Sequence, residues 1–327
     1  MSTDVVCLRP EADFRDVGVA PPSDLRICFT EPGQVSDQVL AGTRALVLAS
    51  VGTRLERSWT DRAPRLELVQ FTGAGVDRIG DAFAHRPEVV VANVPAANSR
   101  EVAEYVLIAA GTLLRGLALA DREIRAGRYS QARARLAPPR ARSLHSRTVG
   151  VVGLGRIGLA VARLMRAVGA EVRYADPAPP DPAAASALGL RRLGLDELLA
   201  GCDLITVHVP LLPATRGLIT EARLRRMRPG ALLINASRGE VVDEAALARV
   251  LADGHLGGAA VDVYREEPPD PDSPLLSLPP GIAERVLYTP HIAGVAHEAA
   301  RQLYREAWQN VHRVLVAGLP AENRVST

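Results

Sequence analysis

Residues 148–177, TVGVVGLGRIGLAVARLMRAVGAEVRYADP, carry the pattern that decides the fold of this 327-residue chain. A short apolar run leads into the turn GLGRIG, and an amphipathic helix pattern follows. In such a turn Gly153 permits a tight bend, Gly155 lets a diphosphate approach the backbone, and Gly158 permits close helix–strand packing. The stretch therefore predicts a dinucleotide-binding unit with the diphosphate at the N-terminus of the helix.

The second strand of this unit ends in an acidic residue. Asp176 lies 18 residues after Gly158 and is followed by Pro177 and Ala178. A carboxylate at that place accepts both ribose hydroxyls of an adenosine and repels a 2′-phosphate. No arginine follows it directly, so NAD is favoured over NADP as cofactor, although Arg173 lies close enough in sequence to keep NADP open.

On both sides of this stretch, short runs rich in Val, Ile and Leu alternate with helix patterns. Such alternation predicts an α/β protein with parallel sheets and helical crossovers. Asp243 stands where a helix N-cap is expected, and the Arg- and Pro-rich segment 122–147 is expected to be an exposed loop. Strands are expected at 25–30, 45–49, 66–71, 89–92, 148–152, 171–175, 203–209, 231–236, 258–263 and 285–288, and helices at 102–120, 159–168, 195–199, 221–227, 244–251 and 298–316.

Composition excludes several classes of function. The formal net charge is +2 with acids and bases interspersed, which argues against nucleic acid as a partner. The chain contains no lysine, and Schiff-base catalysis, pyridoxal phosphate attachment, a Walker phosphate loop and a Tyr-x-x-x-Lys dyad all need one. The three cysteines are far apart, so neither a disulfide nor a metal site is expected.

No secretory signal or membrane span is expected. The N-terminus lacks a basic region followed by an apolar core. The most apolar run, 102–120, contains Glu104 and Arg115, which a membrane centre would penalise by several kcal/mol. A cytoplasmic location is therefore expected.

Three residues that follow predicted strands form a candidate catalytic set. They are Arg238 after LLINAS, Glu267 after GGAAVDV, and His291 after RVLYTP. Reduction of a 2-keto acid by a hydride needs a proton donor, a carboxylate that keeps this donor charged, and an arginine for the substrate carboxylate. Each residue alone has another interpretation: a loop salt bridge, a solvated acid or a strand-end histidine. Together, behind the dinucleotide turn, they favour the catalytic one.

Eight stretches, one of them the glycine turn, make the sequence recognisable. The chain resembles the D-isomer-specific 2-hydroxyacid dehydrogenase family over roughly residues 46–325. The matching stretches are LVQFTGAGVD (68–77), NSREVAEYVL (98–107), TVGVVGLGRIG (148–158), VHVPLLPATRGLI (207–219), NASRGEVVDEAAL (235–247), VDVYREEP (261–268), TPHIAG (289–294) and GLPAENRV (318–325).

The resemblance implies a two-lobed arrangement. A Rossmann dinucleotide-binding domain, residues 99–295, is inserted into a smaller flavodoxin-like substrate domain made of residues 1–98 and 296–327. The crossovers lie near Asn98 and Ala296, with the active site in the cleft between the lobes. A homodimer through the helix region 99–120 is also implied.

The resemblance also implies residue roles. Arg238 binds the substrate carboxylate and keto oxygen, His291 donates and accepts the proton, and Glu267 pairs with His291. Substrate contacts are implied for Ala74, Gly75 and Asn98. Asp262 lies near the nicotinamide amide. The implied cofactor contacts are Gly153, Gly155, Arg156, Ile157, Gly158, Asp176, His208, Pro210, Thr215, Ala236, Asp262 and Gly294.

The sequence leaves the substrate open. An NAD(H)-dependent reductase of a small 2-keto acid such as glyoxylate or hydroxypyruvate is the leading hypothesis. D-3-phosphoglycerate or D-lactate dehydrogenase, and a non-enzymatic NADH-sensing protein of the same fold, are the alternatives. Tyr105 and Tyr129 stand where relatives often carry His and Trp, which bears on substrate preference. Arg133 and Arg135 have two interpretations: they contact an acidic substrate across a dimer, or they are solvated charges on a loop.

Overall fold

The computed structural model of the protein describes residues 3–52, 55, 57–79, 82–83, 85–95, 97–137, 142–178 and 181–325. The chain divides into two compact units, one formed by residues 1–98 and 295–327 and the other by residues 99–294. The second division lies one residue before the expected boundary at 295/296. Both units are built on parallel sheets, so the predicted α/β class is confirmed.

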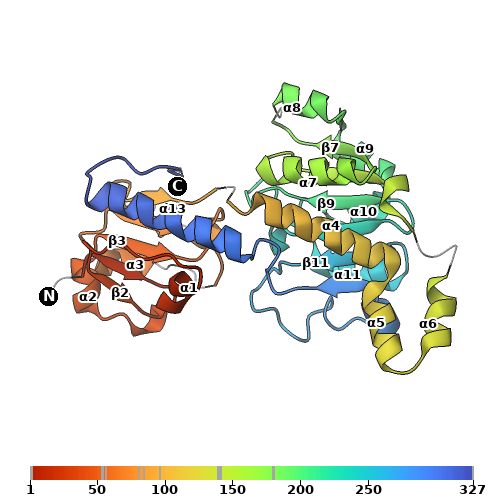
Figure 1. The fold of residues 1–327 in the computed structure, drawn as a ribbon, viewed down its shortest axis with the longest axis horizontal. Helices are drawn as coiled ribbons and strands as arrows, with labels where there is room; N and C mark the ends of the chain where they lie inside the picture. Colours follow the sequence, from red (N-terminus) through yellow and green to blue (C-terminus); the bar gives the residue numbers. More distant parts are fainter. Residues whose placement is uncertain are drawn as a thin grey trace. The chain divides into compact units, whose positions relative to one another are not determined.

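The first unit is a five-stranded parallel sheet with strand order β2-β1-β3-β4-β5. This is the order of flavodoxin-like sheets. Helices α1 (Glu11–Asp16) and α13 (His297–Leu315) bury Phe14 and Trp308 against one face, and α2 (Asp37–Gly42) and α3 (Arg57–Arg62) cover the other (Figure 1). The strands are β1 (Val5–Cys7), β2 (Ile27–Phe29), β3 (Ala45–Leu48), β4 (Leu68–Phe71) and β5 (Val90–Ala92), with short 3₁₀ turns η1 (Pro32–Gln34) and η2 (Asp77–Ile79).

The second unit is a seven-stranded parallel sheet with the order β12-β11-β10-β9-β6-β7-β8. Counted from β6, this is the Rossmann order 3-2-1-4-5-6 with one further strand at the edge. Helices α4 (Ser99–Arg115) and α7 (Arg156–Ala167) cover one face, and α9 (Leu195–Gly201), α10 (Glu221–Arg226) and α11 (Glu244–Ala252) cover the other (Figure 1). The strands are β6 (Thr148–Val152), β7 (Glu171–Ala175), β8 (Arg191–Arg192), β9 (Leu204–Val207), β10 (Leu232–Asn235), β11 (Gly258–Val261) and β12 (Val286–Tyr288).

The sheet buries nearly continuous apolar strands on both faces, as parallel sheets require. Strands β9, β10 and β11 are buried at every residue. The predicted N-cap is confirmed, because the Asp243 side chain accepts a hydrogen bond from the Ala246 amide at the start of α11. The order of the strands reverses between β6 and β9, and ligands bind at the carboxyl ends of strands beside such a reversal.

Two expectations about residues 102–147 are wrong. The single helix expected at 102–120 is broken at Gly116, whose φ of 61° is left-handed, and α5 (Leu117–Arg125) leaves at a bend of 60°. The expected loop 122–147 contains the rest of α5, α6 (Tyr129–Leu136) and the 3₁₀ turn η3 (Leu144–Ser146); residues 138–141 lie outside the described part. Several of the charges that suggested a solvated loop are paired, for example Arg128 with the buried Glu123 at 2.7 Å.

The remaining elements are short. They are α8 (Pro182–Ala187), η4 (Gly239–Val241) and α12 (Pro280–Ala283). Among the described residues, no single helix is long and apolar enough to cross a membrane, whereas the bent pair α4 and α5 passes that test only when counted together.

Candidate active site

The ends of β11 and β12 bring two of the predicted catalytic residues together. Both carboxylate oxygens of Glu267 lie 3.0 Å from Nδ1 of His291. The two side chains are only 15% and 24% exposed, so their interaction is partly shielded from water. Glu267 Oε1 also accepts a hydrogen bond from the Tyr264 amide at 3.1 Å, which fixes the carboxylate.

His291 lies in an unusual backbone conformation. Its φ is 56°, a left-handed value that residues with a Cβ rarely adopt. Its amide donates to the carbonyl of Asp262 at 2.8 Å. The carboxylate of Asp262, which is 1% exposed, accepts the amides of Ile292 and Ala293 at 2.8 Å each. Asp262 therefore holds the turn that presents the imidazole.

Arg238 comes from the neighbouring strand β10. Asn235, at the end of β10, donates to the Arg238 carbonyl at 3.0 Å and accepts the hydroxyl of Ser237 at 2.8 Å, which shapes the loop. The next residue, Gly239, packs against the chain that follows β11, because a Cβ there would lie 2.0 Å from the carbonyl carbon of Tyr264. The Arg238 loop is thus in backbone contact with the segment that carries Glu267.

The predicted set therefore occupies the carboxyl ends of three adjacent strands, β10, β11 and β12. An imidazole with one nitrogen held by a carboxylate has its other nitrogen available for proton transfer. A guanidinium nearby offers a planar fork that fits a carboxylate. This arrangement can bind a 2-oxo or 2-hydroxy carboxylate and move one proton.

The glycine turn has the geometry that a diphosphate site requires. Gly153 has a φ of 89°, and a Cβ on Gly158 would lie 2.0 Å from the carbonyl oxygen of Gly153. Gly155 is the N-cap of α7 without a side-chain cap, and a Cβ there would meet nothing within 4 Å. Arg156 and Ile157 form the first turn of this twelve-residue helix. The amides of this first turn are open to an anion, so the glycine turn and the start of α7 fit the diphosphate of a dinucleotide.

Asp176 lies beside this turn, at the end of β7. Its carboxylate accepts the Leu154 amide at 2.6 Å and the Ala178 amide at 2.8 Å. Arg173 is turned elsewhere, with its guanidinium on Glu171 at 2.8 Å. Sequence reasoning missed Arg192: strand β8 places its guanidinium 2.7 Å from the Asp176 carbonyl oxygen, so an arginine lies beside Asp176 although none follows it directly in the sequence.

His208 follows β9 and lies against the glycine turn. A Cβ on Gly153 would lie 2.7 Å from its carbonyl oxygen. Burial lowers the pKa of His208 to about 3, so the ring is neutral. Its Nε2 is 2.8 Å from the Thr206 hydroxyl, while Nδ1 is buried and lacks a hydrogen-bond partner among the described residues. An orphaned nitrogen beside the predicted cofactor site fits a polar ligand atom.

The other predicted cofactor residues lie on the same edge of the sheet. Thr215 closes its own loop, because its hydroxyl donates to the Pro210 carbonyl at 2.5 Å. Ala236 follows β10 directly, and Gly294 ends the unit beyond the His291 turn.

The predicted substrate contacts Ala74, Gly75 and Asn98 belong to the first unit. Ala74 and Gly75 follow the carboxyl end of β4, and the Ala74 carbonyl accepts the Asn93 side chain at 2.6 Å. Asn98 Oδ1 is buried and has no hydrogen-bond partner within the described ranges.

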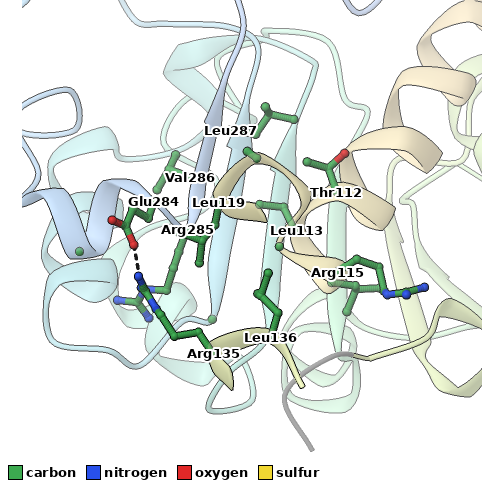
Figure 2. Close-up of a pocket in the computed structure, with 15 residues that line it drawn as sticks. Thr112, Leu113, Arg115, Leu119, Arg135, Leu136, Glu284, Arg285, Val286 and Leu287 are labelled. Carbon is green, nitrogen blue, oxygen red and sulfur yellow. Dashed lines mark hydrogen bonds and ion pairs between the residues drawn. The ribbon is translucent and has the colours of Figure 1, made fainter. Parts of the chain in front are cut away.

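A separate cavity of about 360 Å³ lies under the α5–α6 hairpin (Figure 2). Apolar side chains such as Leu119, Leu136 and Leu287 line it, and it contains none of the predicted site residues. Arg135 points across it to Glu284 at 2.9 Å (Figure 2). The Arg135 guanidinium thus pairs with Glu284 of the same chain, and a substrate reached across a dimer would have to compete with this ion pair.

Comparison with known proteins agrees with this geometry. Residues 107–293 match the family model described as D-isomer specific 2-hydroxyacid dehydrogenase, NAD binding domain. The chain belongs to the D-isomer-specific 2-hydroxyacid dehydrogenase family.

Named relatives differ in substrate and cofactor. The chain is 38% identical over 278 residues to the (S)-sulfolactate dehydrogenase of Chromohalobacter salexigens, covering 84% of this chain and 85% of that one. It is 34% identical over 274 residues to the D-3-phosphoglycerate dehydrogenase of Archaeoglobus fulgidus, covering 84% of this chain but only 50% of that longer protein. An NADPH-dependent glyoxylate/hydroxypyruvate reductase from Sinorhizobium meliloti, solved with NADP and malonate, superimposes with a TM-score of 0.84 at 27% identity, covering 100% of this chain and 97% of that one.

Proposed function

We propose that the protein is an NAD(H)-dependent D-2-hydroxyacid dehydrogenase that works as a reductase of a small 2-keto acid such as glyoxylate or hydroxypyruvate. The observation that carries the proposal is the His291–Glu267 pair at 3.0 Å, which follows β12 and β11, while Arg238 follows the next strand, β10. Family membership supports the reaction class, and the residue roles are proposed here.

The proton is assigned to a specific atom. Because both oxygens of Glu267 face Nδ1 of His291, Nδ1 carries a hydrogen and donates it. The exchangeable proton is then on Nε2, which gives it to the alkoxide oxygen during reduction and takes it back from the hydroxyl during oxidation. Arg238 binds the substrate carboxylate and polarises the neighbouring carbonyl.

The second unit is proposed to hold the cofactor. Bound there, a nicotinamide dinucleotide supplies or accepts the hydride. Gly153, Gly155 and Gly158 would let its diphosphate approach α7, and Asp176 would accept the ribose hydroxyls. NAD is preferred because the Asp176 carboxylate repels a 2′-phosphate, and Arg192 beside it weakens that preference.

The first unit, residues 1–98 and 295–327, is proposed to bind substrate, through Ala74, Gly75 and Asn98. A homodimer through residues 99–120, which comprise α4 and the start of α5, is also proposed. Ile108 and Leu117 support it, because their apolar side chains are 66% and 53% exposed. Sedimentation at micromolar concentration should give a dimer, and a stable monomer would contradict this part.

The test of function is oxidation of NADH and of NADPH over a panel of 2-keto acids. The panel includes glyoxylate, hydroxypyruvate, pyruvate, phosphohydroxypyruvate and 3-sulfopyruvate. Turnover that is fastest with glyoxylate or hydroxypyruvate supports the proposal. A clear preference for the phosphorylated or sulfonated acids would move the assignment toward the activities named for the two relatives. Tight NADH binding without turnover on any acid would favour an NADH-sensing protein.

A further inference from the structure

The left-handed turn at His291 depends on more than the residue itself. A non-glycine residue at a φ of 56° persists only where its surroundings hold it. The buried carboxylate of Asp262 accepts the next two amides, and it accepts a third hydrogen bond from the Thr289 hydroxyl at 2.6 Å. The Asp262 carboxylate therefore holds the His291 turn, and the Thr289 hydroxyl orients this carboxylate.

Thr289 has its own partner on another element. The hydroxyl oxygen of Tyr105, on α4, lies 2.7 Å from Thr289 Oγ1. An ionised carboxylate only accepts, so the single proton of Thr289 goes to Asp262. The Tyr105 hydroxyl must then be the donor to Thr289. The two hydrogen bonds therefore run in one direction: Tyr105 donates to Thr289, and Thr289 donates to Asp262.

Tyr105 is fixed where it can act in this way. Its ring packs in the apolar layer between α4 and the sheet. Burial raises the pKa of Tyr105 to about 12, so the phenol keeps its proton throughout the neutral range. Helix α4 therefore supplies a permanent hydrogen-bond donor to Thr289, the residue that follows β12.

We propose that Tyr105 is a positioning residue for His291, acting through Thr289 and Asp262. The donor on α4 fixes the Thr289 hydroxyl, the hydroxyl fixes the Asp262 carboxylate, and the carboxylate holds the turn that aligns the imidazole with Glu267. The inference rests on the proposed function, in which His291 carries the proton. Two carboxylates hold this turn, Glu267 on the imidazole side and Asp262 on the backbone side.

The first test compares Tyr105→Phe with Tyr288→Phe. Tyr288 is a matched control, because it is half-buried, its pKa is also raised to about 12 by burial, and its hydroxyl donates to the Leu275 carbonyl at 2.7 Å, outside the chain to Asp262. Tyr105→Phe should lower kcat about 3- to 10-fold, the effect of one lost hydrogen bond. The KM for glyoxylate (or the best acid of the panel) and the Kd for NADH should stay within twofold. Tyr288→Phe should leave all three unchanged.

The second test uses Thr289 to separate positioning from a general loss of structure. Thr289→Val should lower kcat at least as much as Tyr105→Phe, and the double variant should be no worse than Thr289→Val alone. Thr289→Ser keeps the hydroxyl and should recover the activity that valine loses.

Additive losses in the double variant would overturn the proposal, as would equal losses of kcat in Tyr105→Phe and Tyr288→Phe. A normal kcat in Tyr105→Phe would overturn it while leaving the proposed function intact, provided that a His291 variant is inactive. Normal turnover of the His291 variant would instead remove the proposed function itself.

Discussion

Replacing Gly239 by alanine should separate the two loops that carry Arg238 and Glu267. A Cβ at this position would lie 2.0 Å from the Tyr264 carbonyl carbon and 2.3 Å from the Arg265 amide nitrogen. Both are backbone atoms, so no side chain can rotate away. Ordinary contact begins at 3.4 Å, and reaching it means a displacement of about 1.4 Å between the loops.

A shift of about 1 Å at a catalytic group can cost about 100-fold in rate. We therefore expect Gly239→Ala to lower kcat/KM for the best 2-keto acid by about 100-fold. Overpacking should lower the free energy of unfolding by about 1–3 kcal/mol. The glycine turn at 153–158 lies on another part of the sheet, so the Kd for NADH, measured by fluorescence titration, should change less than threefold.

Gly281→Ala is the control, since a Cβ there would meet nothing within 4 Å and the residue lies in the same unit. It should behave as wild type in steady-state kinetics and thermal unfolding. A folded Gly239→Ala variant with kcat/KM within twofold of wild type would refute the inference that fixed contact between the loops aligns the site.

Three further predictions test separate parts of the account. Glu267→Gln removes the negative charge 3.0 Å from His291 and should slow 2-keto acid reduction about 10- to 100-fold. Oxidation should slow less, because only reduction begins from the imidazolium. Equal losses of rate in both directions would contradict this prediction. Asp176→Asn should raise kcat/KM for NADPH relative to NADH about tenfold or more, because it removes the carboxylate that repels the 2′-phosphate. Adding Arg192→Ala should abolish this gain, because Arg192 is the proposed partner of the phosphate. A gain that persists in the double variant would exclude Arg192 from this role. His208 has a folded pKa of about 3 against 6.5 when unfolded, so the unfolded state binds more protons between these values and stability falls as pH drops below 6.5. Between pH 7 and 5 the wild type should lose about 2 kcal/mol more than His208→Gln in urea unfolding, and parallel curves would show that the ring titrates normally.

Much of the second unit could be predicted from the sequence, because its signals are local. A glycine turn between an apolar strand and a helix needs no distant contact to be recognised. The apolar runs predict strands β9 to β12, and the three catalytic candidates lie within six residues of the ends of β10, β11 and β12. In a parallel sheet, the carboxyl ends of adjacent strands lie together, so strand positions and order were sufficient to group these residues.

The features that were missed depend on pairing between distant segments. Strand β8 consists of Arg191 and Arg192, without an apolar pattern, and exists because it pairs with β7. That pairing alone brings Arg192 to Asp176. Strand β1 has only three residues and no flanking pattern, yet it pairs with both β2 and β3.

The helix break at Gly116 and the hydrogen bond from Tyr105 to Thr289 could not be predicted from the local sequence either. Gly116 interrupts an apolar run without any change in composition, and only its left-handed φ of 61° reveals the bend. The Tyr105 hydroxyl reaches Thr289 across 184 residues of sequence, a distance that no local pattern reports.

The claim that His291 carries the proton is tested most directly by one variant. Asparagine tolerates a left-handed φ, so His291→Asn should keep the turn while removing the titrating ring. We predict that the rate of NADH oxidation with the best 2-keto acid falls by about 10²- to 10⁴-fold, while NADH still binds within threefold of the wild-type Kd. Turnover near the wild-type rate in this variant would contradict the account.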